Sequence, residues 1–142
     1  MTISADKVAE LHVKHLEMLQ TLIARMAGYG AAFKSYCITV TTAVIGFALT
    51  LHRPAVAALA LLPVIAFGLA DAQYRRVERR FRDVFNLARK ESWEALPSFD
   101  INLQSAPAQS FLSAATSWSI ISFYTPLATG VLLVILGAWL YG

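Results

Sequence analysis

The chain has 142 residues, of which 57% are hydrophobic and only 15% are charged, and its mean hydropathy is +0.55. This length predicts one domain. The small charged fraction excludes an ordinary soluble protein, and the large hydrophobic fraction excludes an intrinsically disordered one. The single cysteine, Cys37, excludes an intrachain disulfide framework. The net charge of +3 is too small to indicate a partner by itself.

The first segment, residues 1–32, is predicted to be an amphipathic helix. Ser4 is its expected N-cap, and Glu10 and Lys14 stand four residues apart, a favourable helical ion pair. Both signs of charge occur on the polar face, whereas helices that lie on a membrane surface are usually rich in Lys and Arg. This favours packing against other helices. The apolar stripe comprises Leu16, Leu19, Ile23 and Met26.

Two pairs of residues in this segment have alternative interpretations. Gly28 and Gly30 loosen the helix just before the first apolar stretch, as a candidate hinge or merely a bend. His12 and His15 stand three residues apart and could share a metal, but no third ligand matches them. We therefore predict no metal site and no cofactor.

Three stretches contain no charged residue: 35–51, 54–70 and 119–141, with 17, 17 and 23 residues. As helices they would measure about 26, 26 and 34 Å, against about 30 Å for a bilayer core. The remaining 85 residues are too few to shield three such helices from water. The sequence thus predicts an all-α membrane protein whose transmembrane domain, 33–142, has spans at about 33–51, 54–70 and 119–141.

The basic residues predict the orientation. Eleven of the twelve lie before the first span or between the second and third, and only Arg53 lies in the short turn His52-Arg53-Pro54. By the positive-inside rule, the N-terminus and the helical segment 71–118 are cytoplasmic, and the C-terminus, Tyr141-Gly142, lies outside.

The first span has one polar face. Its small and hydroxyl residues are three or four positions apart and therefore share a side of the helix; they are Ser35, Thr39, Thr42 and Gly46, with Thr50 extending the row. Hydroxyl groups in a membrane can line water, and small residues allow two helices to approach closely. Pore lining and helix packing both remain open.

The central segment begins at Asp71 and is predicted to continue the helix of the second span. An apolar seam runs along it through Tyr74, Val77, Phe81, Val84 and Ala88. Glu78 is expected to pair with Arg82 or Arg75, and Asp83 with Arg79 or Arg80.

A cluster of basic residues occupies the same segment: Arg75, Arg76, Arg79, Arg80, Arg82, Arg89 and Lys90. It is either a solvated helix face that also satisfies the positive-inside rule, or an anion site for phosphates or anionic lipid headgroups. Arginine outnumbers lysine, which favours bidentate phosphate recognition. Beyond it, Trp93 and Phe99 lie in a turn-rich linker and could stack on a base or pack internally.

No enzyme signature occurs in the chain. The sequence has no nucleophile elbow, no phosphate-binding glycine loop and no pair of carboxylates within an apolar stretch. We therefore expect a protein that is not an enzyme.

Several short strings resemble a family of small bacterial membrane proteins, the membrane effectors of the Hailong anti-phage defence system. They are His15-Leu16-Glu17-Met18-Leu19-Gln20, Arg25-Met26-Ala27, Asp71-Ala72-Gln73-Tyr74, Glu78-Arg79-Arg80-Phe81-Arg82 and Phe123-Tyr124. The resemblance implies an oligomeric channel of the bacterial cytoplasmic membrane, genetically linked to a nucleotidyltransferase that makes single-stranded DNA oligomers. It further implies that the oligomer holds the channel shut until infection.

Together these observations predict a homo-oligomeric channel, taken as a tetramer, in the lipid bilayer. A single-stranded DNA oligomer would regulate it at the basic surface between Arg75 and Lys90. The alternatives are a non-conducting adaptor that recruits a soluble partner to the membrane and a constitutively lytic toxin.

Overall fold

The computed structural model of the chain describes residues 4–51 and 53–141, and within these ranges every regular element is helical. The elements are α1 (Ala5–Leu51), α2 (Pro54–Ala58), α3 (Leu61–Ala88), the 3₁₀ helix η1 (Leu103–Ser105), α4 (Phe111–Ala115) and α5 (Trp118–Tyr141). Residues 1–3 of the predicted N-terminal helix, His52 of the predicted turn and the predicted outer residue Gly142 lie outside the described residues.

Helix α1 is a single helix of 47 residues that contains both the predicted N-terminal amphipathic helix and the predicted first span. The Ser4 carbonyl accepts the first backbone hydrogen bonds, from Lys7 and Val8. Lys14 Nζ lies 2.9 Å from a Glu10 carboxylate oxygen, which confirms the predicted pair. The long helix follows because no proline interrupts residues 5–51 and because a second helix supports α1 along its length.

The second span is interrupted near its start. A turn at Leu59 and Ala60 separates α2 from α3 because Pro63 has no N–H to donate to the Leu59 carbonyl. That carbonyl instead accepts from the Leu62 N–H at 3.1 Å. Past this turn, α3 continues through Asp71 into the charged segment without a break, as predicted.

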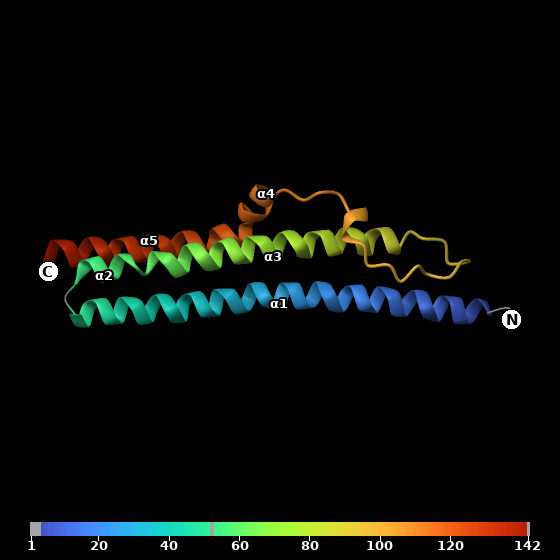
Figure 1. The fold of residues 1–142 in the computed structure, drawn as a ribbon, viewed down its shortest axis with the longest axis horizontal. Helices are drawn as coiled ribbons and strands as arrows, with labels where there is room; N and C mark the ends of the chain where they lie inside the picture. The colour runs from blue at the N-terminus through green and yellow to red at the C-terminus, as the bar shows by residue number, and fades with distance from the viewer. Residues whose placement is uncertain (1–3, 52, 142) are drawn as a thin grey trace.

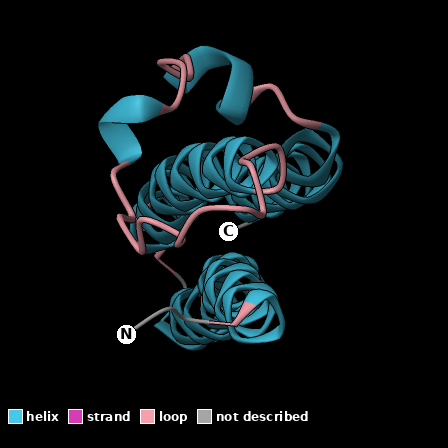
Figure 2. Cartoon of the chain, turned by 90° about the vertical axis from the view of Figure 1, so that its right-hand side faces the viewer, coloured by secondary structure: helices cyan, strands magenta, loops and turns pink. Residues whose placement is uncertain are grey.

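Helix α1 runs the whole length of the molecule, and α2 and α3 return alongside it (Figure 1). Viewed along the axis, α1 forms one layer, while α3 and α5 form a second (Figure 2). Helix α5 accompanies α2 and the first part of α3 only, so the half with the C-terminus contains α1, α2, part of α3 and α5 (Figure 1). The other half contains α1, α3 and the linker 89–117 (Figure 1).

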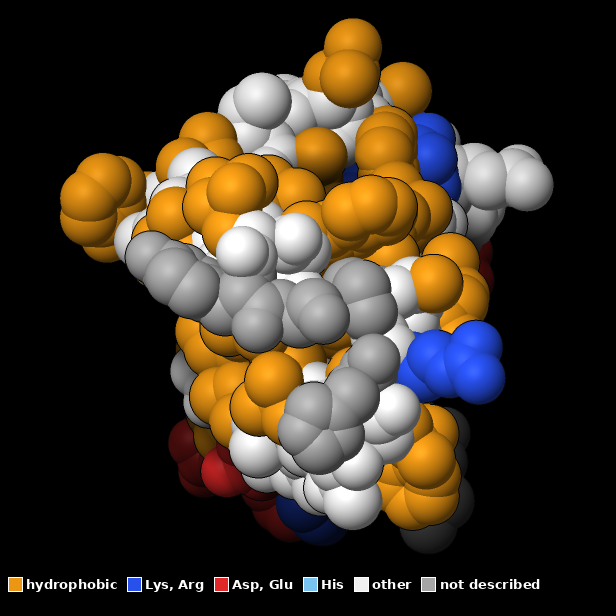
Figure 3. All heavy atoms as spheres, turned by 90° about the vertical axis from the view of Figure 1, so that its left-hand side faces the viewer, with side chains coloured by type: hydrophobic (Ala, Val, Ile, Leu, Met, Phe, Trp, Pro, Cys, Tyr) orange, Lys and Arg blue, Asp and Glu red, His pale blue; other side chains and the backbone are white. Residues whose placement is uncertain are grey.

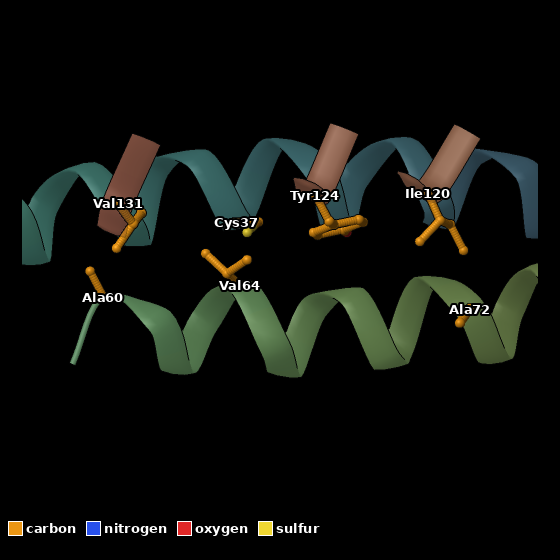
Figure 4. Packing of buried hydrophobic residues seen from close by; sticks show 7 residues of the cluster. All are labelled: Cys37, Ala60, Val64, Ala72, Ile120, Tyr124 and Val131. Carbon is orange, nitrogen blue, oxygen red and sulfur yellow. The ribbon is translucent and has the colours of Figure 1, made fainter. Parts of the chain in front are cut away.

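Each half has its own buried cluster. In the half with the C-terminus, Cys37 of α1 and Val64 of α3 lie toward one another, and Val131 of α5 lies over Ala60 (Figure 4). In the other half, Leu19 is fully buried against Val84, Ala88 and Ala106. Complete burial of a leucine contributes about 1.5–3 kcal/mol in water, so this second cluster holds α1, α3 and the linker together outside the apolar region.

Three helical stretches are long and apolar enough to span a membrane: Ala5–Leu51, Ala55–Ala88 and Trp118–Leu140. Large apolar side chains on them face outward; Phe47 is 68% exposed and Leu133 is 64% exposed. Hydrophobic side chains also cover most of the end where the C-terminus lies (Figure 3). Such a surface suits hydrocarbon rather than water, and the chain is an all-α membrane protein.

Candidate functional site

The basic cluster predicted from the sequence lies on the charged half of α3 and just beyond it. Arg89 is the C-cap of the helix, and Lys90 follows in the adjoining turn. The remaining members lie within the helix: Arg75, Arg76, Arg79, Arg80 and Arg82. The structure divides the cluster by partner into three groups, which differ in their freedom to bind a ligand.

The first group surrounds a buried carboxylate. Glu78 is only 3% exposed, and both of its oxygens have an arginine partner. Arg82 approaches one oxygen at 2.7 Å, and Arg75 approaches the other at 3.3 Å. Both partners named by the sequence are therefore confirmed. Because two guanidinium groups meet one carboxylate, this group keeps one net positive charge.

The second group fastens the linker 89–117 to α3. Each of its arginines donates to a backbone carbonyl of the linker that is far away in the sequence. The bonds join Arg76 to Gln109 at 2.7 Å, Arg79 to Ser113 at 3.1 Å and Arg80 to Leu103 at 2.6 Å. These three side chains thus have a structural task that the sequence pattern did not reveal.

Asp83 belongs to the same fastening. It accepts a hydrogen bond from Gln109 Nε2 at 2.7 Å, and no ion pair joins it to another described residue. The predicted pairing of Asp83 with Arg79 or Arg80 is therefore wrong, because the linker supplies a neutral amide there instead.

The third group consists of Arg89 and Lys90. Both are exposed, and neither has a hydrogen-bonding or ionic partner among the described residues. Arg82 is also exposed, although it pairs with Glu78. Fully hydrated cations on one side of a helix end are accessible to a polyanion, so this group is the part of the cluster most available to a large ligand.

Two adjoining hollows lie at the charged start of this region and share Arg75, Glu78 and Ser119. The inner hollow, of about 270 Å³, lies between α1 and α3 and includes Lys34 and Asp71. The arginine hollow, of about 400 Å³, is lined by Arg75, Glu78, Arg79, Arg82, Ser117, Trp118 and Ser119. Polar groups of both hollows therefore meet where the apolar part of α3 ends.

The inner hollow contains an ion pair that was not predicted from the sequence. Lys34 Nζ lies 2.6 Å from Asp71 Oδ2, and the Asp71 side chain is only 2% exposed. The same ammonium lies 5.8 Å from the centre of the Phe123 ring of α5. The pair joins α1 to α3 across 37 residues of sequence. One feature of the sequence could have predicted this pair: opposite charges stand at the adjoining ends of two apolar stretches that run antiparallel.

Gly30 provides the close approach that this pair requires. A Cβ atom at this position would lie 2.8 Å from Asp71 Oδ1, whereas nothing lies within 4 Å of a Cβ at Gly28. Helix α1 passes through both glycines without a break. The hinge at Gly28 and Gly30 thus stays a prediction, and the structure gives Gly30 a packing role.

The polar face of the first span is turned away from the rest of the chain. Ser35, Thr39, Thr42 and Gly46 are all exposed, whereas the opposite face of α1 contributes the buried Gly30, Cys37, Thr41 and Ala48. Thr39 donates to the Ser35 carbonyl at 3.0 Å, which partly satisfies its hydroxyl. The predicted face exists, and no described residue packs over it as a helix of this chain would.

His12 and His15 both contact residues of the linker. The His12 ring stacks on Trp93 at 5.2 Å, and its Nε2 lies 2.8 Å from the Ala95 carbonyl oxygen. His15, 2% exposed, packs against Phe99 with 5.4 Å between ring centres. Both aromatic residues of the linker therefore pack against α1, which was one of the two interpretations, although Trp93 and Phe99 each keep an exposed side.

The arrangement as a whole is suited to binding anions. Buried carboxylates are neutralised in place by Lys34, Arg75 and Arg82, and further cations remain at the surface. No protein-family model matches the chain, and neither the curated proteins nor the solved structures contain a match. The candidate site thus combines positive charge beside an apolar helical bundle with hydroxyl groups on an exposed face of α1.

Proposed function

We propose that the chain is the subunit of a homo-oligomeric membrane channel, regulated by an anionic ligand that binds its basic surface. The N-terminus and segment 71–118 would lie in the cytoplasm, because eleven of the twelve basic residues are at that end. The C-terminus would lie outside. The bacterial cytoplasmic membrane is the membrane that the resemblance implies.

The exposed hydroxyl face of α1 carries this proposal. Among the described residues, one chain provides three helices that could span a membrane, and they pack on one another. In a monomer, the hydroxyl face would contact hydrocarbon while the apolar face of α1 is buried inside. Placed around an axis of several subunits, the same face would line water or meet its own copies, both of which suit hydroxyl groups better than lipid does.

The basic surface supplies the regulation. Arg89 and Lys90 project from the end of α3, and the same helix is joined to α1 by Lys34 and Asp71. A ligand that draws α3 and its linker into one position would therefore act on α1, whose polar face is the pore candidate. It can do so only by binding one state of the channel more tightly than the other.

The ligand that the resemblance suggests is a single-stranded DNA oligomer, made by a genetically linked nucleotidyltransferase as part of anti-phage defence. Successive phosphates would contact the exposed cations, so that binding weakens steeply with salt. A tetramer would place four such surfaces around one axis and multiply a weak charge into a strong field.

Ion flux from liposomes that contain the purified protein tests the conducting part of the proposal. Thr39→Leu with Thr42→Leu should lower the flux severalfold, because two hydroxyl groups become bulky apolar ones. Val40→Leu is the matched control, since it changes an exposed apolar position of the same helix. No flux from folded oligomers would instead favour an adaptor, and uncontrolled damage to cells without any partner would favour a lytic toxin.

Regulation is tested with a different pair of variants. Arg89→Glu with Lys90→Glu should abolish the effect of the oligonucleotide on flux while assembly stays intact, because these side chains hold no other part of the chain. Arg25→Glu, which reverses the charge of an exposed arginine of α1, is the control for a charge reversal outside this surface. Unchanged regulation in the double variant would exclude this surface.

A further inference from the structure

The arginine hollow has the composition of a phosphate site. Its wall contains the guanidinium groups of Arg75, Arg79 and Arg82 against the single carboxylate of Glu78, so positive charge remains in excess. Arg79 uses only Nη1 in its contacts with Ser113, which leaves its other nitrogen atoms without a described partner. Arginine offers a planar fork of donors that matches two phosphate oxygens at once.

Hydroxyl and backbone groups complete the wall. Ser117 Oγ is shielded from solvent and has no hydrogen-bond partner among the described residues. Ser119 contributes a second hydroxyl to the hollow. Helix α5 begins at Trp118, and in its first turn the N–H groups of Ile120 and Ile121 already donate to the Ser117 carbonyl at 3.0 Å, which leaves those of Trp118 and Ser119 without a described partner. These donors add to the guanidinium groups rather than define the site.

The position of the hollow indicates what class of phosphate-containing ligand it would bind. The apolar length of α5 starts here, and the apolar part of α3 ends nearby at Asp71. Trp118 lines the hollow and is 83% exposed, and Leu112 of α4 is 73% exposed. An exposed tryptophan at the end of a spanning helix is typical of the headgroup region of a bilayer. A ligand here would have its phosphate in water and its remaining bulk against apolar side chains.

We therefore propose that the arginine hollow binds the phosphate group of an anionic membrane phospholipid. Two guanidinium groups are committed to Glu78, and the third, Arg79, would make the principal contact with the headgroup. The lipid site is separate from the exposed Arg89 and Lys90 and does not depend on conduction. It would tie the start of α5 and the middle of α3 to the same lipid molecule.

Native mass spectrometry of the full chain in detergent micelles tests the site, with phosphatidylglycerol as the probe and phosphatidylcholine as the uncharged-headgroup comparison. The wild-type chain should retain phosphatidylglycerol at least severalfold more tightly. Arg79→Gln should weaken that retention about tenfold, the loss expected for a charge-assisted hydrogen bond. Arg89→Gln removes the same charge from the same helix outside the hollow and should retain the lipid as the wild type does.

Equal retention of the two lipids, or equal losses in the two variants, would overturn the proposal, since either result would indicate apolar contact or net charge alone. Ser119→Ala is a second test of the hollow in case the Arg79 variant misfolds. Ser119 makes no described hydrogen bond to the linker, so this variant should fold, and it too should weaken retention of the lipid. Inorganic phosphate at millimolar concentration should not displace the lipid, and displacement would overturn the assignment to a phospholipid. None of these measurements involves flux or oligonucleotide, so they remain interpretable if the channel proposal fails.

Discussion

Substitution of Gly30 by alanine tests how closely α1 and α3 approach. The new Cβ atom would lie 2.8 Å from Asp71 Oδ1, about 0.6 Å inside the 3.4 Å at which ordinary contact begins. The carboxylate has little room to move, because it is buried and Lys34 holds its other oxygen at 2.6 Å. Either the ion pair must distort or the two helices must separate.

The size of the effect follows from two opposing contributions. Alanine is favoured over glycine in a helix by about 1 kcal/mol. Overpacking of a tight contact costs about 1–3 kcal/mol. Gly28→Ala has the first contribution only, because nothing lies within 4 Å of its Cβ. The two variants should therefore differ by about 1–3 kcal/mol in free energy of unfolding, with Gly30→Ala the less stable.

Reversible denaturant unfolding in detergent micelles, followed by circular dichroism, measures this difference. A second measurement isolates the contact: in an Asp71→Ala background the obstructing oxygen is gone, so Gly30→Ala should become as favourable as Gly28→Ala. Equal stabilities of the two single variants, or an unchanged effect of Gly30→Ala in that background, would refute the reasoning.

Three further predictions concern other contacts. Asp71→Ala should cost about 3 kcal/mol of unfolding free energy because it leaves Lys34 partly buried and unpaired, and Lys34→Met combined with Asp71→Leu should recover most of it. Trp93→Ala removes the stack on α1 and should increase protease cleavage of the linker severalfold, with an unchanged rate contradicting that packing role. Hydrogen bonds from Lys7 and Lys14 lower the pKa of Glu10 to about 2. Because the folded pKa lies below the unfolded one, the contribution of this pair is present above about pH 4.5 and lost as the pH falls toward 2; Lys14→Met should raise the NMR titration midpoint of Glu10.

Much of the architecture could be predicted because the membrane imposes a simple pattern. Stretches without charge located the three spans, and the continuation of α3 through Asp71 followed from unbroken helical periodicity. The single helix α1 was harder, since Gly28 and Gly30 are typical of a loosened helix in isolation. Only the tertiary contact with Asp71 shows why a glycine stands at position 30.

The partners of the basic cluster could be predicted only where they are close in sequence. Glu78 lies three and four residues from its arginines, and helical spacing names such pairs. Arg76 and Arg80 instead bond to carbonyls of the irregular linker, which has no periodicity to reveal its path. Predicting the Lys34–Asp71 pair would likewise have required knowing how α1 and α3 are aligned along each other. That alignment depends on side-chain packing along their whole length.

The unbroken length of α1 gives it mechanical leverage. At 1.5 Å per residue, its arms extend about 44 Å and about 26 Å on either side of Lys34. If the contact with Asp71 acts as a fulcrum, a tilt of about 5° would displace the tip near Ala5 by about 4 Å and the far tip at Leu51 by about 2 Å in the opposite direction. A stiff rod of this kind transmits a small push at one end to the other without any change in its own fold.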